Sequence, residues 1–189
     1  MVRINKIYTK TGDKGITMLA DGQSVPKSSA ILVAIGLIDS LNVAIGHCVL
    51  IARDGNHISY KQTQLAYLQN RLFDLGAELS KAVQAEKITS KDTAMLEDWI
   101  DEITNKTPPL TSFVLPGGNK LSLYLHSARC QCRQAELACW GLNEVNQISS
   151  DLLIFLNRLS DYLFALSRFA CIEKGLDERL WEPGLKFKK

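Results

Sequence analysis

Apolar residues recur every three or four positions along most of this chain, which is the spacing of one face of an α-helix. The first series predicts a helix from Ser28 or Ser29 to about residues 54–56. Two more series predict a helix over about residues 59–81 and one that begins at Thr89 or Ser90 and is stopped by Pro108. The inward positions of these three helices are Ile31, Ala34, Ile38, Leu41, Ile45 and Cys48; Leu65, Leu68, Leu72, Leu75 and Leu79; and Met95, Leu96, Trp99, Ile100 and Ile103.

The second half of the chain contains two longer apolar series. They are Leu121, Leu125, Ala128, Cys132, Ala135, Cys139 and Leu142, and then Leu152, Leu156, Leu159, Leu163, Leu166 and Ala170, with Gly175 suited to end the last helix. Residues 113–118 predict a short extended stretch and a turn, and residues 1–27, rich in glycine and polar residues, predict a loop. Because no alternating strand pattern competes, the sequence predicts an all-α five-helix bundle.

The length of 189 residues suits a single domain over residues 1–189. We divide it into a loop region at 1–27, a helical bundle at 28–175 and a C-terminal tail at 176–189. The 22 Lys and Arg nearly balance the 20 Asp and Glu, which gives a net charge of +2. Such a balance predicts neither nucleic acid nor an anionic membrane as a partner, so any function must lie in a local site.

Cysteine usage and the start of the chain predict a cytoplasmic protein. The first residues carry no apolar targeting segment, and the apolar stretch 31–38 is too short to span a membrane. An odd count of five cysteines indicates reduced thiols. Cys130 and Cys132 are two positions apart, so on a helix they face different ways and are interpreted as core residues; no residue is assigned as a metal ligand.

Polar residues form stripes beside the apolar faces of three helices. They are His126, Arg129, Arg133 and Glu136; Asn157, Asp161 and Arg168; and Asp39, Asn42 and Gly46. One interpretation is a solvated surface with weak ion pairs, such as Arg133 with Glu136. The other is a site for a polyanionic ligand at a subunit boundary, because arginine fixes geometry and clamps phosphate better than lysine does.

The segment 9–17 is rich in groups that bind phosphate. Glycine lets backbone N–H groups approach an anion, threonine hydroxyls donate, and Lys10 and Lys14 add positive charge. The segment is not a Walker A loop, because that motif's spacing is absent. Taken alone, it is equally well interpreted as a flexible N-terminal loop.

Together these segments resemble the PduO-type ATP:cob(I)alamin adenosyltransferases. The matching blocks run in family order from the first residues to about residue 170. They are residues 7–15 (IYTKTGDKG), 25–27 (VPK), 36–42 (GLIDSLN), 113–118 (FVLPGG), 126–129 (HSAR) with Arg133, Ala135 and Glu136, and 157–164 (NRLSDYLF).

The resemblance implies a cobalamin adenosyltransferase-like bundle with an N-terminal nucleotide-binding loop, assembled as a homotrimer with active sites between subunits. It implies transfer of the 5′-deoxyadenosyl group of ATP to cob(I)alamin, which gives adenosylcobalamin and triphosphate, with Mg²⁺ on the phosphates. It also implies a corrinoid reductase as a partner. Since cob(I)alamin is a strong nucleophile, the protein's task is to position the ribose 5′ carbon and stabilise the leaving triphosphate.

The family pattern also implies roles for individual residues. The triphosphate and nucleoside would be surrounded by Thr9, Lys10, Thr11, Gly12, Lys14, Thr17, Met18 and Lys27. Arg133, Glu136 and Asn157 would complete the ATP site, together with the neighbouring positions Gln134 and Leu137. Asp39 and Arg129 would form an ion pair between chains, and Phe113 would lie against the corrinoid and keep its lower axial position empty.

The chain departs from the family pattern at a few positions. Gln134 and Leu137 stand where the family usually has arginine, and Ser40 stands where it has glutamate. These departures leave an alternative open, a non-catalytic trimer that holds a corrinoid or a nucleotide. A purely structural bundle is a third hypothesis, which the conjunction of the loop, the arginine stripe and the Phe113 block disfavours.

Overall fold

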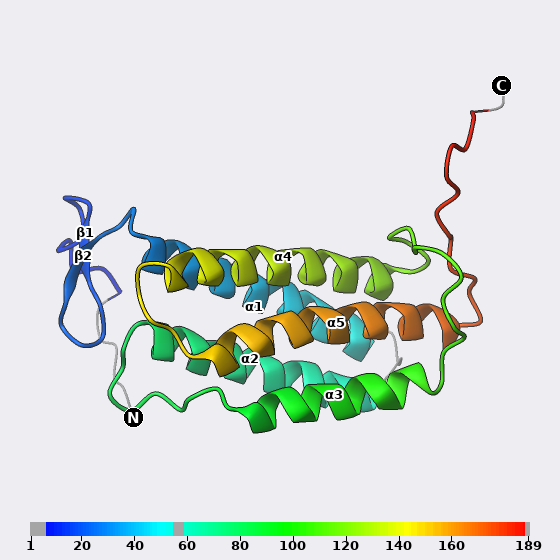
Figure 1. Cartoon of the computed structure of the whole chain (residues 1–189), viewed down its shortest axis with the longest axis horizontal. Coiled ribbons are helices and arrows are strands. Elements are labelled where there is room, and N and C mark those ends of the chain that lie inside the picture. The colour runs from blue at the N-terminus through cyan, green and yellow to red at the C-terminus, as the bar shows by residue number, and fades with distance from the viewer. Residues whose placement is uncertain (1–6, 55–58, 188–189) are drawn as a thin grey trace.

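The computed structural model describes residues 7–54 and 59–187. In this part of the chain the elements are β1 (Ile16–Met18), β2 (Ser24–Pro26), α1 (Ala30–Asp54), α2 (Ser59–Leu79), α3 (Ser90–Thr104), α4 (Lys120–Asn143) and α5 (Ser150–Ile172). Figure 1 shows the helices side by side, with the β1–β2 hairpin at one end and the C-terminal tail at the other. The expectations for the first six residues and for a helix end at residues 55–56 lie outside the described residues.

The five-helix bundle predicted from the apolar series is confirmed. Helix α1 packs against α4 and α2, while α5 packs against α4 and α3. Nearly all of the predicted inward residues are buried in one core, including every one on α4 and α5. On α3, however, Met95, Trp99 and Ile100 are only partly buried, because this helix lies at the edge of the bundle and packs mainly on α5.

The prediction that residues 1–27 form only a loop is wrong at residues 16–18 and 24–26, which form the β1–β2 hairpin. Strands β1 and β2 are antiparallel, with Thr17 opposite Val25. Each strand has three residues, too few for an alternating pattern to be seen in the sequence. The hairpin is fastened to the end of α2, because the Ala20 N–H donates to the Ser80 carbonyl at 3.0 Å and Lys81 donates to Gln23 Oε1 at 3.0 Å.

Helix α1 is longer than the apolar stretch considered above. By length and composition, the segment Ala30–Arg53 could cross a membrane. Core helices of globular proteins meet the same criterion, and 44% of its most apolar window is buried inside the bundle. Its contacts with α4 and α2 account for its apolar character.

A buried arginine joins α2 to the start of α3. Arg71 Nε donates to Asp92 Oδ1 at 2.9 Å, and Arg71 Nη2 donates to the Lys87 carbonyl at 2.8 Å. The same Asp92 carboxylate accepts the Thr89 N–H at 2.9 Å and so caps α3. The connection between α2 and α3 and the N-terminal cap of α3 therefore share one ion pair, whose side chains are only 8% and 9% exposed.

We expect Arg71→Gln to lower the free energy of unfolding by about 3 kcal/mol, because Asp92 would remain buried without its cation. Arg158→Gln is the matched control: its pairs with Glu97 and Asp161 lie at the surface, and we expect a loss of at most about 1 kcal/mol. The measurement is urea unfolding followed by circular dichroism at one protein concentration. Equal losses in the two variants would contradict the role given to Arg71.

Candidate functional site

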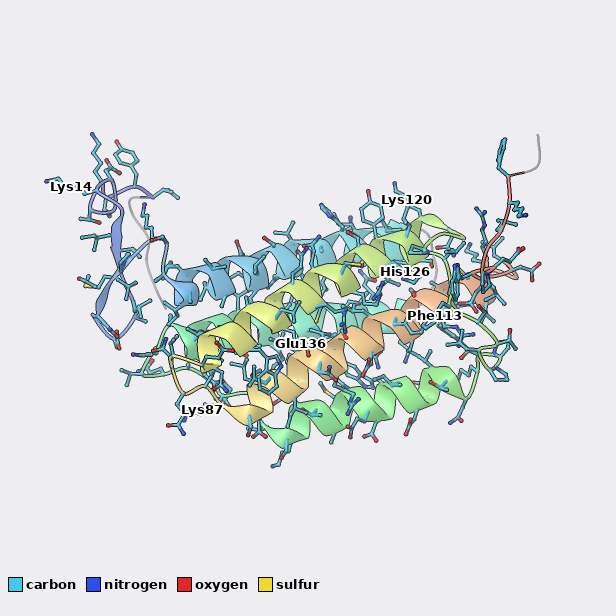
Figure 2. The ribbon with its side chains drawn as sticks, turned by 45° about the horizontal axis from the view of Figure 1, so that its top comes forward. Lys14, Lys87, Phe113, Lys120, His126 and Glu136 are labelled. Carbon is cyan, nitrogen blue, oxygen red and sulfur yellow. The ribbon has the colours of Figure 1, made fainter. Side chains whose placement is uncertain are left out.

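The predicted phosphate-binding loop, residues 9–15, projects from one end of the bundle (Figure 2). Lys10 at φ 63° and Gly15 at φ 79° adopt left-handed backbone conformations that turn the chain back on itself. The Thr9 and Thr11 hydroxyls lie 2.8 Å apart, and both threonines are exposed, as are Lys10 and Lys14. The loop thus presents hydroxyls and two cations to solvent, and Figure 2 shows Lys14 at this end.

Lys27 lies across the phosphate-binding loop. A Cβ added at Gly12 would come within 3.0 Å of both Cε and Nζ of Lys27. The Lys27 N–H also donates to the Gly15 carbonyl at 2.8 Å, which ties the end of the hairpin to the loop. The structure therefore brings Gly12 and Lys27 together, and the missing side chain at Gly12 leaves room for the ammonium group. On β1, Thr17 is half-buried and Met18 is exposed.

A second group of predicted residues meets between α4 and α5. Asn157 Nδ2 donates to Glu136 Oε1 at 3.0 Å, and Glu136 is only 8% exposed. Arg133, one turn before Glu136, is exposed, and no ion pair joins them in the described part of the chain. The predicted Arg133–Glu136 pair is therefore wrong: Glu136 bonds across to α5, which leaves Arg133 turned outward. Gln134 and Leu137 are exposed as well.

Asp39 and Arg129 lie on the outer sides of α1 and α4. Asp39 is exposed and borders a groove of about 290 Å³ with Ser40, His47 and Gln131. Arg129 is half-buried; its Nε is buried with no hydrogen-bond partner among the described residues, and its Nη2 reaches only Cys130 Sγ at 3.6 Å. Asp39 and Arg129 do not pair within one chain. Asn42, from the same predicted stripe, instead donates to the Gln69 carbonyl on α2 at 2.8 Å.

Phe113 lies at the far end of the bundle from the phosphate-binding loop, as Figure 2 shows. Its side chain is 77% exposed, in the predicted extended stretch between α3 and α4. Helix α4 has 24 residues and so spans about 36 Å between these two ends. The phosphate-binding loop and Phe113 of one chain therefore cannot reach the same small ligand.

His126 is a buried polar residue on α4 that sequence reasoning placed in a stripe but not in the site. Its Nε2 lies 3.2 Å from Ser167 Oγ, and its Nδ1 has no partner among the described residues. Burial, with a smaller contribution from the Arg129 cation, lowers the pKa of the imidazole, while Glu178 opposes the shift. The ring also borders a groove of about 460 Å³ with Pro116, Leu123 and Tyr124.

The remaining stripe residues divide between surface and interior. Asp161 accepts from Arg158 at 3.0 Å on the surface, as the solvated interpretation predicts. Arg168 is buried and bonds to Glu178 at 2.8–3.1 Å, so it is not available to a shared anionic ligand. Sequence reasoning missed Glu178, since it lies in the tail, beyond the end of α5 and outside any periodic pattern.

The five cysteines are all free thiols. Burial raises the pKa of Cys48 to about 12, and burial together with the Glu136 carboxylate raises that of Cys139 to about 12. The interpretation of the Cys130–Cys132 pair as core residues is correct for Cys132, whose thiol donates to the Leu156 carbonyl. It is wrong for Cys130, which is exposed because it lies on the outer side of α4.

Comparisons with known proteins agree on one class of fold and activity. A variant of the PduO-type ATP:corrinoid adenosyltransferase from Lactobacillus reuteri, solved with cobalamin and ATP, superimposes with a TM-score of 0.87. The two sequences are 35% identical, and the match covers 93% of this chain and 99% of that one. A second variant, solved with ATP, has a TM-score of 0.86 at 35% identity, over 93% and 100% of the two chains. The bundle therefore has the corrinoid adenosyltransferase fold.

Sequence relatives identify the family. The chain is 40% identical to a corrinoid adenosyltransferase of Mycobacterium leprae over 97% of this chain and 98% of that protein. It is 38% identical to the human corrinoid adenosyltransferase MMAB over 95% and 74% of the two proteins. The family model for cobalamin adenosyltransferase matches residues 7–170, so the chain belongs to this family. Its activity is adenosyl transfer from ATP to a corrinoid, which forms adenosylcobalamin.

The lowered pKa of His126 predicts how stability depends on pH. Below its usual value of 6.5, the unfolded chain binds a proton that the folded chain does not, so the free energy of unfolding falls as pH drops. We expect this fall between pH 6.5 and 5 to be shallower in His126→Gln, while the two proteins change in parallel above pH 7. Urea unfolding at a series of pH values measures it; identical pH profiles would contradict a buried neutral imidazole.

Proposed function

We propose that this chain transfers the adenosyl group as a homotrimer in which each active site takes its phosphate-binding loop from one subunit and its corrinoid-contacting Phe113 from a neighbour. The observation that carries this proposal is the position of these two parts at opposite ends of one bundle. A head-to-tail contact repeated around a three-fold axis would bring the loop of each chain to the far end of the next and would close the assembly.

The unpaired charges on α1 and α4 support the same assembly. The exposed Asp39 carboxylate and the buried, unpartnered Nε of Arg129 are complementary groups that do not meet within one chain. Arg129 is half-buried and has no carboxylate partner among the described residues of its own chain, and a carboxylate from a neighbour would pair with the part of its side chain that remains accessible. The pair would then fix how two subunits are aligned at the site.

The nucleotide half of the proposed site provides charge for the leaving group. Lys10, Lys14 and Lys27 would surround the triphosphate, and the outward guanidinium of Arg133 would clamp it with a planar set of donors. These cations stabilise negative charge that grows on the triphosphate as the bond to the ribose 5′ carbon breaks. Asn157 holds the Glu136 carboxylate in place, where it can accept from ribose hydroxyls.

Magnesium fits this loop chemically. The loop offers exposed oxygen donors, the Thr9 and Thr11 hydroxyls and the Asp13 carboxylate, which are the hard ligands that Mg²⁺ prefers alongside phosphate oxygens and water. Bound there, Mg²⁺ would neutralise part of the triphosphate charge. The lysines would neutralise the rest and hold the nucleotide against the bundle.

The corrinoid half of the proposed site is apolar. The substrate's Co(I) is the nucleophile, so no side chain is needed as a base, and the protein has to present the metal in line with the 5′ carbon. The exposed Phe113 ring would exclude a lower axial ligand, which makes the reduction that precedes transfer easier. A Lactobacillus reuteri relative solved with both cobalamin and ATP supports the binding of both substrates by this chain.

Two further parts of the proposal concern the surroundings of the enzyme. Formation of Co(I) requires an electron donor, so a corrinoid reductase is the protein partner that the chemistry calls for. The proposed compartment is the cytoplasm, supported by five free cysteines, of which four are buried and only Cys130 is exposed.

We expect Arg133→Ala to lower kcat by at least about 100-fold, because a preorganised donor to the leaving group is lost. Arg133→Lys should recover part of that loss, since it keeps the charge but not the planar fork. The measurement is anaerobic conversion of chemically reduced cobalamin with ATP, followed by absorbance. Lys91→Ala, exposed on α3, is the control. An Arg133→Ala enzyme as active as this control would contradict the role of Arg133.

Mixing two inactive variants tests the shared site directly. Lys27→Ala disables the phosphate-binding loop and Phe113→Asp disables the corrinoid side. In trimers reassembled from equal amounts of both, about one quarter of the sites should combine an intact loop with an intact Phe113 from different chains. We therefore expect activity to return to about one quarter of the wild-type value after joint denaturation and refolding.

Each variant refolded alone is the control and should stay inactive. If every site drew both parts from one chain, no mixed trimer would contain an intact site, and the mixture would stay as inactive as its components. Sedimentation of the wild-type chain as a monomer under assay conditions would also overturn the proposal.

A further inference from the structure

We propose that Arg168 and Glu178 are positioning residues that hold Phe113 at the corrinoid through the C-terminal tail; this inference rests on the proposed function of Phe113. In Figure 1 the tail runs beside the α3–α4 loop, at the end of the bundle where Figure 2 labels Phe113. Phe113 is 77% exposed, so packing of its own side chain does little to fix where it points.

The backbone of residues 112–115, the Phe113 stretch, is held by the tail. The Leu115 N–H donates to the Arg179 carbonyl at 2.8 Å, and the Trp181 N–H donates to the Phe113 carbonyl at 2.7 Å. These two bonds form a short antiparallel bridge between Val114 and Leu180. The orientation of the Phe113 stretch therefore depends on where the tail lies.

Side chains reinforce this bridge. The Phe113 and Trp181 ring centroids lie 6.0 Å apart with the planes at 59°, a favourable tilted arrangement. The Ser112 hydroxyl donates to the Trp181 carbonyl at 2.9 Å. Each of these contacts joins residues 112–115 to the tail, while the Gly117 carbonyl, further along, accepts from Cys171 Sγ on α5 at 3.8 Å. The tail has an anchor of its own.

The anchor is a buried ion pair between α5 and the tail. Arg168 Nε donates to Glu178 Oε1 at 2.9 Å and to Oε2 at 3.1 Å, and Nη2 donates to Oε2 at 2.8 Å. The side chains are only 9% and 11% exposed, so the pair is little screened by solvent. Glu178 immediately precedes the residues that pair with the Phe113 stretch.

The same guanidinium holds the other flank of Phe113. Arg168 Nη2 also donates to the Pro108 carbonyl at 2.9 Å, where the loop leaves α3. One side chain on α5 thus fixes the loop before Phe113 and the tail strand beside it. Since Arg168 is itself buried, it acts on the corrinoid only through Phe113.

Glu178→Gln and Glu182→Gln form a matched pair of variants. Both remove one carboxylate from the tail, but Glu178 is paired and nearly buried, whereas Glu182 is exposed. Glu178→Gln leaves Arg168 buried without its counter-ion, which weakens the anchor. Arg168→Lys is a second variant that keeps the charge and removes the fork that reaches both Glu178 and Pro108.

The first readout is hydrogen exchange at the Leu115 and Trp181 amides, which needs no activity. We expect both amides to exchange at least about tenfold faster in Glu178→Gln than in Glu182→Gln, while amides in the core of α4 stay unchanged. The second readout is kinetic. We expect the KM for the corrinoid to rise about tenfold and the KM for ATP to change less than about twofold, because in the proposed site the neighbour's phosphate-binding loop holds the nucleotide, and the Arg168–Glu178 pair does not touch that loop.

The outcomes separate this inference from the proposed function. If the wild type transfers no adenosyl group, the proposed function fails, and the exchange readout alone still tests the anchor. If the wild type is active and Glu178→Gln matches Glu182→Gln in exchange or in corrinoid KM, the positioning role is overturned. If Glu178→Gln does not fold, Arg168→Lys takes its place under the same criteria. Equal rises in both KM values would indicate a structural role only and would also overturn it.

Discussion

Helix α4 is the constraint on which the rest of the structure depends. Its 24 residues run without a break, and at about 1.5 Å per residue they set a fixed separation between the two ends of the bundle. The phosphate-binding loop lies beyond one end, and the extended stretch with Phe113 leads directly into the other. A rigid spacer of this length keeps the loop and Phe113 of one chain apart, and this separation is the physical reason for the proposal that each active site combines two subunits.

Most of the fold could be predicted from the sequence because its helices are long and amphipathic. On α4 and α5 every predicted inward residue is buried, since a series of six or seven apolar positions has no competing interpretation. The hairpin was not predicted, because strands of three residues are too short for a pattern. The tail was not predicted either: its pairing with residues 113–115 depends on two backbone bonds between segments about 65 residues apart, which leave no mark in local sequence.

The sequence predicted the individual residues of the candidate site better than it predicted the contacts between them. Motif resemblance named Glu136 and Asn157, and the structure joins them by a hydrogen bond. Spacing suggested instead that Glu136 pairs with Arg133, because positions three apart on a helix are neighbours. In the structure Glu136 bonds to Asn157 on α5 instead, because Asn157 lies on the side of α4 where the Glu136 carboxylate is buried. Glu178 could not be found from periodicity, because its role arises only when the tail folds back onto α5.

The charged residues divide into two sets with different physical roles. Arg71 and Arg168 are buried, each bonds a carboxylate and a backbone carbonyl, and each joins segments that would otherwise separate. Arg133 and Asp39 are exposed and, in the described part of the chain, join nothing. Exposed charges of this kind contribute little to stability. In a chain with a net charge of only +2, they could be replaced by neutral residues without loss of stability. Under the proposed function, the exposed arginine on α4 binds a polyanion and the aspartate on α1 pairs with Arg129 of a second chain; these partners would account for charged groups that the fold of one chain does not use.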